Sequence, residues 1–373
     1  YPILVERHDA ISGGILREER AFARTLQAGT NHLEEALIPL TSAERVVGRE
    51  LDDVPADAPV LAGATAFKLH DTYGFPIDLT VELAAEYGVR VDREGFEVAL
   101  QEQRERSRSG ARQDLTRQAE LTALYDGIKR RVGDTAFLGY ETTTAPGRIR
   151  AIVRDDTEYD DLEARSDTEG QVEAAAQASI VLDETPFYPE GGGQIGDQGV
   201  FLGEDGEVVF TVTDTQRPVS GLIVHSGTLH GKVSRRQQVQ AVVDADRRAR
   251  TMRNHTGTHV LHRALRNALG DSARQAGSLV TPDYLRFDYP SDRGLRPEEK
   301  TAIEAEVRRI IREDRPVTPE HMSMAQAQAA GADAFFDEKY GETVRTVRVE
   351  DYSHELCGGT HCRATGQIGG FII

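Results

Sequence analysis

Two short motifs contain the residue types that bind transition metals. His255-Thr-Gly-Thr-His259 places two histidines four positions apart. On a helix these positions share one face, so both imidazoles can reach a single ion. Alone, such a pair would more simply be two surface histidines. A second pair with the same spacing, Cys357-Gly-Gly-Thr-His361, lies in a glycine-rich turn beside the other cysteine of the chain, Cys362. Because cysteine and histidine are the preferred zinc ligands, the two motifs together predict one zinc site.

These residues leave open whether the zinc is structural or catalytic. A structural site uses four protein ligands, whereas a catalytic site keeps a position for water or substrate. His255, His259 and Cys357 are the firm ligand candidates, and His361 as a fourth is compatible with either type. Thr256 stands where metalloprotease helices carry a glutamate base, which disfavours peptide hydrolysis. A hydrolase here would depend on the metal to polarise a carbonyl or activate water, and an activated ester would be the suitable substrate.

Polar residues near the two motifs are weaker candidates. Gln275 follows the predicted metal helix and is suited to orient a water or a substrate hydroxyl. A hydrogen bond to the backbone of its own loop is an equally good account of it. His262 and Glu355 are expected to support the ligands from outside or to lie at the surface.

Composition excludes several classes of protein. The chain has 373 residues, which predicts two or three domains, and 39% of them are hydrophobic, which excludes wholesale disorder. No run approaches the roughly 18 apolar residues of a membrane span. The two cysteines exclude a disulfide framework. We therefore expect a soluble, cytoplasmic protein without a membrane partner. Because the chain opens at Tyr1-Pro2 and stops in an apolar run, we expect a piece of a longer protein.

Charge is informative through its distribution. The net charge of −18 argues against a phosphate-binding protein, because such affinity comes from lysine and arginine. The bases are nevertheless clustered, so that RNA contacts are a second interpretation beside a solvated helix surface. The candidate phosphate contacts are Arg104, Arg106, Arg108, Arg112, Arg247, Arg248 and Arg250.

Hydrophobic periodicity predicts an α+β multidomain protein in three parts. Apolar residues at near-heptad spacing over Ile15–Leu37 indicate an amphipathic helix, and short β-branched runs separated by turns begin near residue 149. Helices and strands mix after residue 230, with one helix over Arg253–Leu269 and another over Pro297–Arg312. The predicted parts are a helical region at 1–122, a small antiparallel β-barrel with a glycine-rich loop at 123–230, and an α+β zinc domain at 231–373.

Several longer segments resemble a known family. Five segments resemble parts of the editing domain of alanyl-tRNA synthetases. They are Arg253–His262, Gln275–Ser278, Leu285–Asp288, Glu355–His361 and the loop Phe187–Gln194. Two further segments, Glu18–Gly29 and Phe67–Pro76, resemble the middle, tRNA-recognition region of the same synthetases. Free-standing editing proteins would not share these two, which disfavours that interpretation. The resemblance covers nearly the whole chain.

The resemblance implies a proofreading hydrolase. The family loads alanine onto tRNA(Ala) with ATP, through a core whose motifs are not found in this sequence, so aminoacylation is not expected here. An alanine pocket cannot strongly reject glycine or serine, since one methylene or hydroxyl gives only about 1–3 kcal/mol of discrimination. A β-barrel followed by an α+β zinc domain, shared with threonyl-tRNA synthetases, hydrolyses the mischarged Ser-tRNA(Ala) and Gly-tRNA(Ala). Oligomerisation would use family regions absent from this chain.

The resemblance also assigns roles to residues. Zinc bound by His255, His259, Cys357 and His361 would position the ester for attack by water. Gln275 matches a position at the editing pocket, and Thr185 and Gln194 are expected to line it. The arginine clusters are expected to contact tRNA phosphates. The alternative from a different class is an RNA-binding module whose zinc is purely structural.

Overall fold

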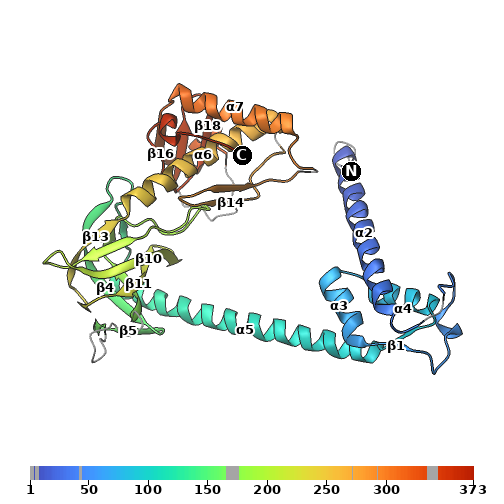
Figure 1. Cartoon of the computed structure of the whole chain (residues 1–373). Coiled ribbons are helices and arrows are strands. Elements are labelled where there is room, and N and C mark those ends of the chain that lie inside the picture. Colours follow the sequence, from blue (N-terminus) through green and yellow to red (C-terminus); the bar gives the residue numbers. More distant parts are fainter. Residues whose placement is uncertain are drawn as a thin grey trace. The chain divides into compact units, whose positions relative to one another are not determined.

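The computed structural model describes residues 4, 8–41, 44–164, 176–270, 272–291, 293–333 and 343–373, with the backbone alone at 9, 10, 17, 105–115 and 176. The chain divides into two compact units, Tyr1–Gln118 and Ala119–Ile373, close to the predicted boundary at 122 (Figure 1). Helix α5 (Arg93–Val132) begins in the first unit and ends in the second. Among the described residues, no helix combines the length and apolar character needed to cross a bilayer.

The first unit is mainly helical, as the sequence predicts. Its other elements are α2 (His8–Leu37), η1 (Leu51–Asp53), β1 (Val60–Leu61), α3 (Gly63–Tyr73), α4 (Ile77–Glu86) and β2 (Arg90–Val91), with β1 and β2 paired in parallel. Leu33 and Leu37 of α2 are buried against a small core around Phe75. The predicted apolar stripe is buried only at this end, because Ile15 and Phe22 are 57% and 51% exposed.

The second unit begins with a closed antiparallel β-barrel. Six strands follow the order β13-β9-β10-β11-β7-β4, and β13 also pairs with β4, which closes the barrel. The strands are β4 (Thr144–Arg154), β7 (Ala176–Leu182), β9 (Gly199–Leu202), β10 (Val208–Val219), β11 (Leu222–Leu229) and β13 (Gln238–Val243). Short strands accompany them: β3 (Ala136–Phe137) with β8 (Glu184–Thr185), β5 (Thr157–Tyr159) beside β4, and β6 (Asp161–Glu163) with β12 (Lys232–Ser234). The barrel thus extends to Val243, beyond the predicted end at 230.

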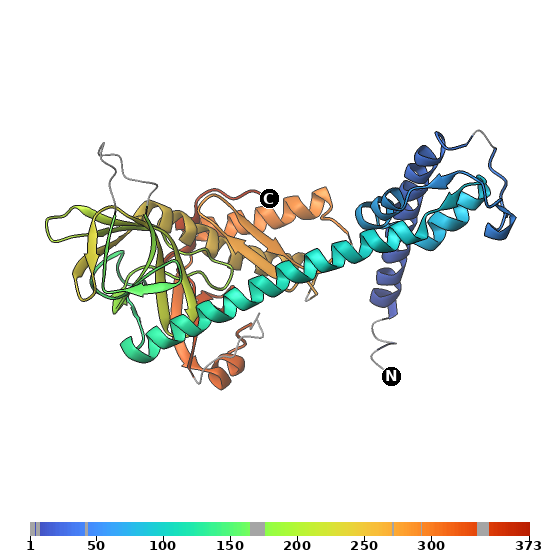
Figure 2. The same cartoon turned by 90° about the horizontal axis from the view of Figure 1, so that it is seen from below.

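Alternating side chains fill the barrel. Buried and exposed residues alternate along β13 and the first half of β4, which is the period of a strand with one face in a core. Ile149, Phe187 and Phe201 are among the large side chains at the centre. The last turns of α5 cover one outer face, where Ile128 packs among strand residues such as Val181 (Figure 2). Strand β4 is therefore buried on both faces where it passes under the helix.

An α+β layer follows the barrel. It consists of α6 (Ala245–Leu269), the hairpin β14 (Gly277–Val280) and β15 (Leu285–Asp288), α7 (Pro297–Glu313), α8 (Met324–Ala329), η2 (Thr365–Ile368) and the sheet β16 (Val317–Ser323), β17 (Thr343–Val349) and β18 (Ser353–Leu356). Helix α6 begins at Ala245 rather than Arg253, because the Asp244 side chain accepts a hydrogen bond from the Arg247 amide, 2.9 Å away, and caps the helix. The apolar face predicted for α7 packs on α6 and β17 as a second core.

Candidate metal centre

The structure brings the two predicted motifs together. Helix α6 carries His255 and His259, and the turn after β18 carries Cys357 and His361. One potential ligand atom from each residue lies within 4.8 Å of the other three. The Cys357 sulfur is 3.4 Å from Nε2 of His255 and 3.2 Å from Nε2 of His361. A small contraction around one ion would give the Zn–N and Zn–S distances of about 2.1 and 2.3 Å.

Local geometry explains why these residues meet. One helical turn separates His255 from His259, so their rings stack with centroids 5.4 Å apart and planes only 9° from parallel. The turn that carries Cys357 packs directly on the first ring. A β-carbon at Gly359 would lie 2.0 Å from Cε1 of His255, so the turn reaches the helix only because this position is glycine.

Each histidine of the cluster is oriented through its Nδ1 atom. Nδ1 of His255 is 2.7 Å from the amide oxygen of Gln194, and Nδ1 of His259 contacts the carboxylate of Glu355. Nδ1 of His361 is 3.3 Å from the Thr256 hydroxyl. Ligating histidines characteristically donate their second ring N–H to such acceptors, which fixes the tautomer and points Nε2 at the metal.

The donors fit a zinc ion. Nε2 of His259 is buried and has no hydrogen-bond partner in the described part of the chain. An unsatisfied buried imidazole nitrogen is costly without a ligand. Three imidazoles and one thiol form a donor set that zinc prefers.

Glu355 supports two histidines at once. From the sequence it was expected only to support the ligands from outside or to lie at the surface. The structure shows that it is buried and holds both His259 and His262, the latter at 2.9 Å.

Electrostatics favour the ligand forms of two residues. Burial opposes ionisation of Cys357, but the nearby His255 and His361 outweigh it and hold the pKa of the thiol well below its ordinary value. Burial also lowers the pKa of His361 to about 3, so that its imidazole is neutral at pH 7. His259 differs, because Glu355 and Cys357 overcome the effect of burial and raise its pKa to about 10. This proton must leave when a metal binds.

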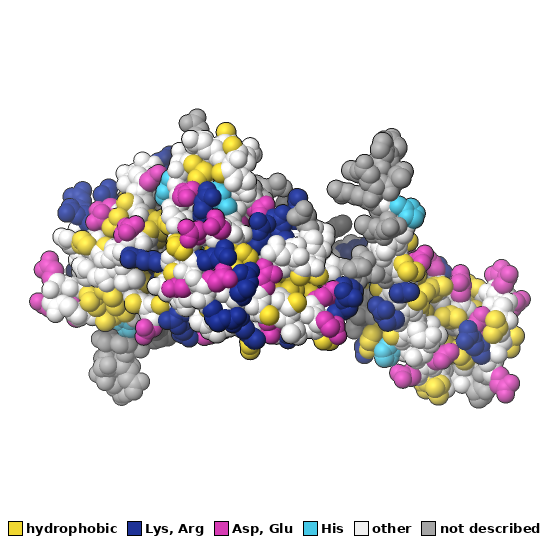
Figure 3. Space-filling view, turned by 90° about the horizontal axis from the view of Figure 1, so that it is seen from above, with side chains coloured by type: hydrophobic (Ala, Val, Ile, Leu, Met, Phe, Trp, Pro, Cys, Tyr) yellow, Lys and Arg dark blue, Asp and Glu magenta, His cyan; other side chains and the backbone are white. Residues whose placement is uncertain are grey.

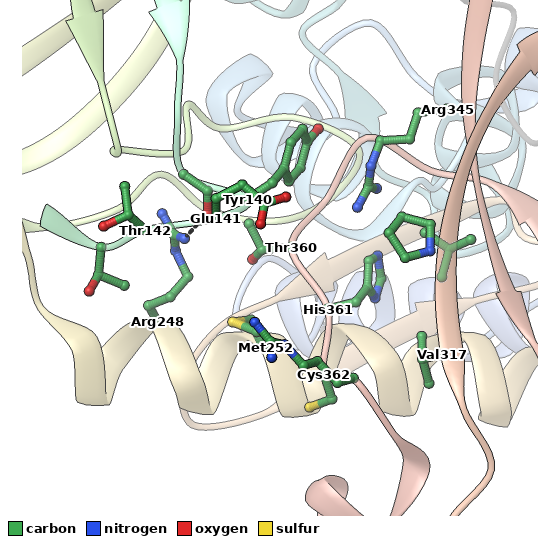
Figure 4. A pocket seen from close by; sticks show the side chains of 15 residues that line it. Tyr140, Glu141, Thr142, Arg248, Met252, Val317, Arg345, Thr360, His361 and Cys362 are labelled. Atoms are coloured by element: carbon green, nitrogen blue, oxygen red, sulfur yellow. Dashed lines mark hydrogen bonds between the residues drawn. The ribbon is translucent and has the colours of Figure 1, made fainter. Parts of the chain in front are cut away.

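Two cavities flank the cluster. The first, of about 280 Å³, is lined by His255, His259 and Cys357 together with Gln275 and Ser278. The second, of about 460 Å³, lies on the side of His361 and is shown in Figure 4 with Thr360 and Arg345 beside it. Each of the four potential metal ligands thus lines one of these two cavities.

Two residues that the sequence analysis missed form a wall common to both cavities. The Arg345 guanidinium lies 4.2 Å from the ring centroid of Tyr140, within cation–π range. Nη1 of Arg345 donates to the carbonyl oxygens of Cys357 and Gly359 at 2.7 and 3.0 Å. The Tyr140 hydroxyl donates to the carbonyl oxygen of Gly358 at 2.6 Å. The pair therefore fixes the ligand turn. No motif marks either residue, because their role depends on contacts between distant segments.

The predicted pocket residues separate into three positions. Gln275 lines the smaller cavity, and its amide nitrogen donates to the Ser278 hydroxyl at 3.0 Å. Gln194 is fully buried behind His255 and supports that ligand instead of lining the cavity. Thr185 requires a correction, because it lies inside the barrel with its hydroxyl 2.8 Å from Nε2 of His225 and does not line either cavity.

The predicted phosphate contacts also need revision. Arg248 is only 3% exposed, pairs with buried Asp197 and donates to two backbone carbonyls, so most of its donors are used in holding the barrel and α6 together and its side chain is not an exposed phosphate contact. Arg250 is exposed and lies 3.0 Å from Asp283, Arg247 is half-buried and Arg104 is exposed. Positions Arg106, Arg108 and Arg112 lie outside the side chains that the structure describes. Basic and acidic side chains are interspersed over the face in Figure 3.

Comparison with known proteins identifies the class. A family model described as "tRNA synthetases class II (A)" matches residues 1–247, and one described as "Threonyl and Alanyl tRNA synthetase second additional domain" matches 344–373. The chain is thus related to class II aminoacyl-tRNA synthetases. It is 42% identical to the alanine–tRNA ligase of Roseiflexus sp. (strain RS-1) and 43% identical to that of Thermus thermophilus, in each case over 100% of this chain and 40% of the relative.

The chain belongs to the alanyl-tRNA synthetase family, which confirms the resemblance seen in its motifs. It spans about 40% of the length of the curated relatives it matches.

Proposed function

We propose that this chain hydrolyses the ester bond of tRNA(Ala) mischarged with serine or glycine. The observation that carries the proposal is the four-residue cluster His255, His259, Cys357 and His361, which borders a cavity that also contains Gln275. The family relationship makes an aminoacyl-tRNA the natural substrate. ATP-dependent activation of alanine is not part of the proposed activity. Because Cys357 must stay reduced to bind a metal, we place the activity in the cytoplasm.

The residues around the cavity divide the chemistry among them. Zinc bound by the cluster would supply Lewis acidity toward an ester carbonyl. Gln275 contributes a side-chain amide to the cavity wall, and we expect this amide to bind a hydroxyl or a water next to the ester. Glu355 and Gln194 hold the ligands in place, and Arg345 fixes the turn that carries Cys357. Preorganisation of this kind is what lets a site act on a weakly bound small group.

Hydrolysis assays with defined tRNAs test the proposal. Purified chain with measured zinc content is incubated with Ser-tRNA(Ala), Gly-tRNA(Ala) and Ala-tRNA(Ala), and ester loss is followed against the uncatalysed rate. We expect rapid loss of the seryl and glycyl esters, sparing of the alanyl ester, and no loss above background with Cys357→Ala. Circular dichroism and tRNA binding establish that the variant is folded. If wild type and folded variant lose ester equally slowly, the hydrolase proposal is wrong.

A second candidate is an RNA-binding module with a structural zinc. One observation favours it: four protein donors converge, which is enough to close a tetrahedral shell. The same assay separates the candidates, because this module would bind tRNA without cleaving any ester. The proposed RNA contacts at Arg104, Arg247 and Arg250 apply to both candidates. Reversal of their charge is expected to weaken tRNA binding and reduce its salt dependence.

A further inference from the structure

A cavity of about 410 Å³ on the barrel is lined almost entirely by arginine. Three segments that are distant in sequence form it: the end of α5, the middle of β4, and the turn between β12 and β13. Its lining residues are Arg131, Val132, Arg148, Ile149, Arg150, Arg235 and Arg236. We call it the arginine cavity. None of its residues belongs to the metal centre or to the cavities beside it.

The positive charge in the arginine cavity is only partly neutralised. Arg131 pairs with Glu158, and Arg235 lies 2.6 Å from Asp160. Within the part of the chain that the structure describes, the guanidinium groups of the other three arginines have no carboxylate at ion-pair distance. The nearest acid is at the backbone, where the Arg148 amide donates to the Asp183 carboxylate at 2.7 Å. Like charges around one cavity repel each other, and this repulsion is relieved when an anion enters. The chain as a whole carries −18, so this local excess of positive charge runs against its overall balance.

Backbone contacts hold the arginines in place. The Arg236 amide donates to the Ile149 carbonyl at 2.7 Å, and Ile149 in turn donates to Gln237 at 2.9 Å. Arg236 has φ +74°, in the left-handed region that a residue with a β-carbon seldom occupies. Arg148 on β4 is the strand partner of Gln238 on β13, and Gln238 follows Arg236 by two residues. The turn therefore presents its side chains beside those of β4, at a conformational cost that a binding role would explain.

We infer that the arginine cavity binds backbone phosphates of the RNA substrate. Guanidinium groups bind phosphate oxygens through paired N–H donors, and arginine suits this role better than lysine. Among the described residues, no aromatic ring on which a base could stack lines the cavity, and the remaining lining residues, Val132 and Ile149, are aliphatic. The contacts are therefore independent of base sequence and position the RNA on the barrel. This inference rests on the proposed function for the identity of the RNA.

Binding of uncharged tRNA(Ala) to the whole chain tests the inference. Arg148→Gln/Arg236→Gln removes two exposed charges that make no side-chain hydrogen bond in the described structure. The matched control, Lys300→Gln/Arg312→Gln, removes the same charge from exposed positions on α7. Fluorescence anisotropy between 50 and 200 mM KCl gives the affinity and its salt slope. We expect the cavity variant to bind about tenfold more weakly, with a slope reduced by about 1.4–1.8 for two lost contacts, while the control stays within about twofold of wild type.

The possible outcomes are distinguishable. Equal affinities and slopes for both variants overturn the inference. Inorganic phosphate is titrated by calorimetry in parallel: if the cavity variant loses phosphate binding but keeps its tRNA affinity, the site takes small anions and the RNA assignment is wrong. Weakened tRNA binding in a chain that cleaves no ester supports the arginine cavity and overturns the proposed hydrolase. If the chain cleaves the ester but the cavity variant keeps its tRNA affinity, the proposed hydrolase is supported and the arginine cavity inference is wrong.

Discussion

Buried histidines serve two different purposes in the barrel and in the metal centre. In the barrel, both ring nitrogens of His225 have partners, with the Thr185 hydroxyl at 2.8 Å and the Ile180 carbonyl at 3.0 Å. In the metal centre, His259 is held at Nδ1 by Glu355, while its buried Nε2 has no hydrogen-bond partner among the residues that the structure describes. The first ring completes a closed network, whereas the second has one nitrogen available for the metal that we propose.

The contrast separates a structural histidine from a ligand histidine. Burial is similar in both regions, since His225 and His259 are 0% and 6% exposed. Burial lowers the pKa of His225 to about 4, and the hydrogen bond to the Ile180 carbonyl opposes this only in part. Next to Glu355 and Cys357, the pKa of His259 rises to about 10 despite burial. Partners at the second nitrogen, and the charges nearby, therefore distinguish the two roles better than burial does.

Removal of the thiol would give the largest effect. We expect Cys357→Ala to abolish zinc binding at pH 7. Loss of a residue that only supports a ligand typically costs about 10–100-fold, and we expect the rate of Ser-tRNA(Ala) hydrolysis to fall by more than this. Zinc per chain is measured by mass spectrometry after dialysis. The buried His225→Gln variant is the control, and it should keep its zinc. Retention of one zinc by folded Cys357→Ala would contradict the assigned ligand set.

The second-largest effect is expected when the pH is lowered, which should destabilise the barrel through His225. The folded-state pKa of His225, about 4, is below its unfolded value of about 6.5, so the stability it contributes is complete above pH 6.5 and is lost as the pH falls toward 4. At about 1.4 kcal/mol per pH unit, the loss between pH 7 and pH 4.5 is about 2.4 kcal/mol, because the two titrations are incomplete at these limits. His225→Gln cannot titrate and should lose less. Urea unfolding with a chelator present, at both pH values, measures the difference, and equal losses would refute this account.

Weakening the support of a ligand would give an intermediate effect. Glu355→Gln replaces a carboxylate that accepts from two histidines with an amide that accepts through one oxygen. We expect zinc affinity to fall by about 10–100-fold, with the fold retained. Competition with a chromophoric chelator measures the affinity. An unchanged value would show that Glu355 does not orient the ligands.

The smallest effect is expected at the cavity wall. Gln275→Ala leaves the zinc ligands intact and removes one side-chain hydrogen-bonding group from the cavity. A neutral hydrogen bond contributes about 0.5–1.5 kcal/mol, so we expect kcat/KM for Ser-tRNA(Ala) to fall about 3–10-fold without change in zinc content. Ser278→Ala removes the partner of Gln275 and should give a smaller loss. Wild-type kinetics in Gln275→Ala would exclude it from the site.

The sequence predicted what depends on local spacing. Histidines at i and i+4 lie on one helix face wherever the helix packs, and the only two cysteines stand beside the second histidine motif. Strand runs of β-branched residues and the apolar face of α7 followed from periodicity in the same way. The family resemblance, carried by long ordered motifs, extended this to the class of protein.

Where two distant segments meet was decided by the tertiary structure alone. Arg248 and Arg250 are neighbours in one basic run, yet the first is buried against Asp197 and the second is exposed, because one helix turns them to different sides. Thr185 and Gln194 occur in the same loop region and bond histidines of different kinds. The arginine cavity likewise exists only because barrel closure joins β4 to β13. Side-chain chemistry is written in the sequence, but its partners are set by long-range packing.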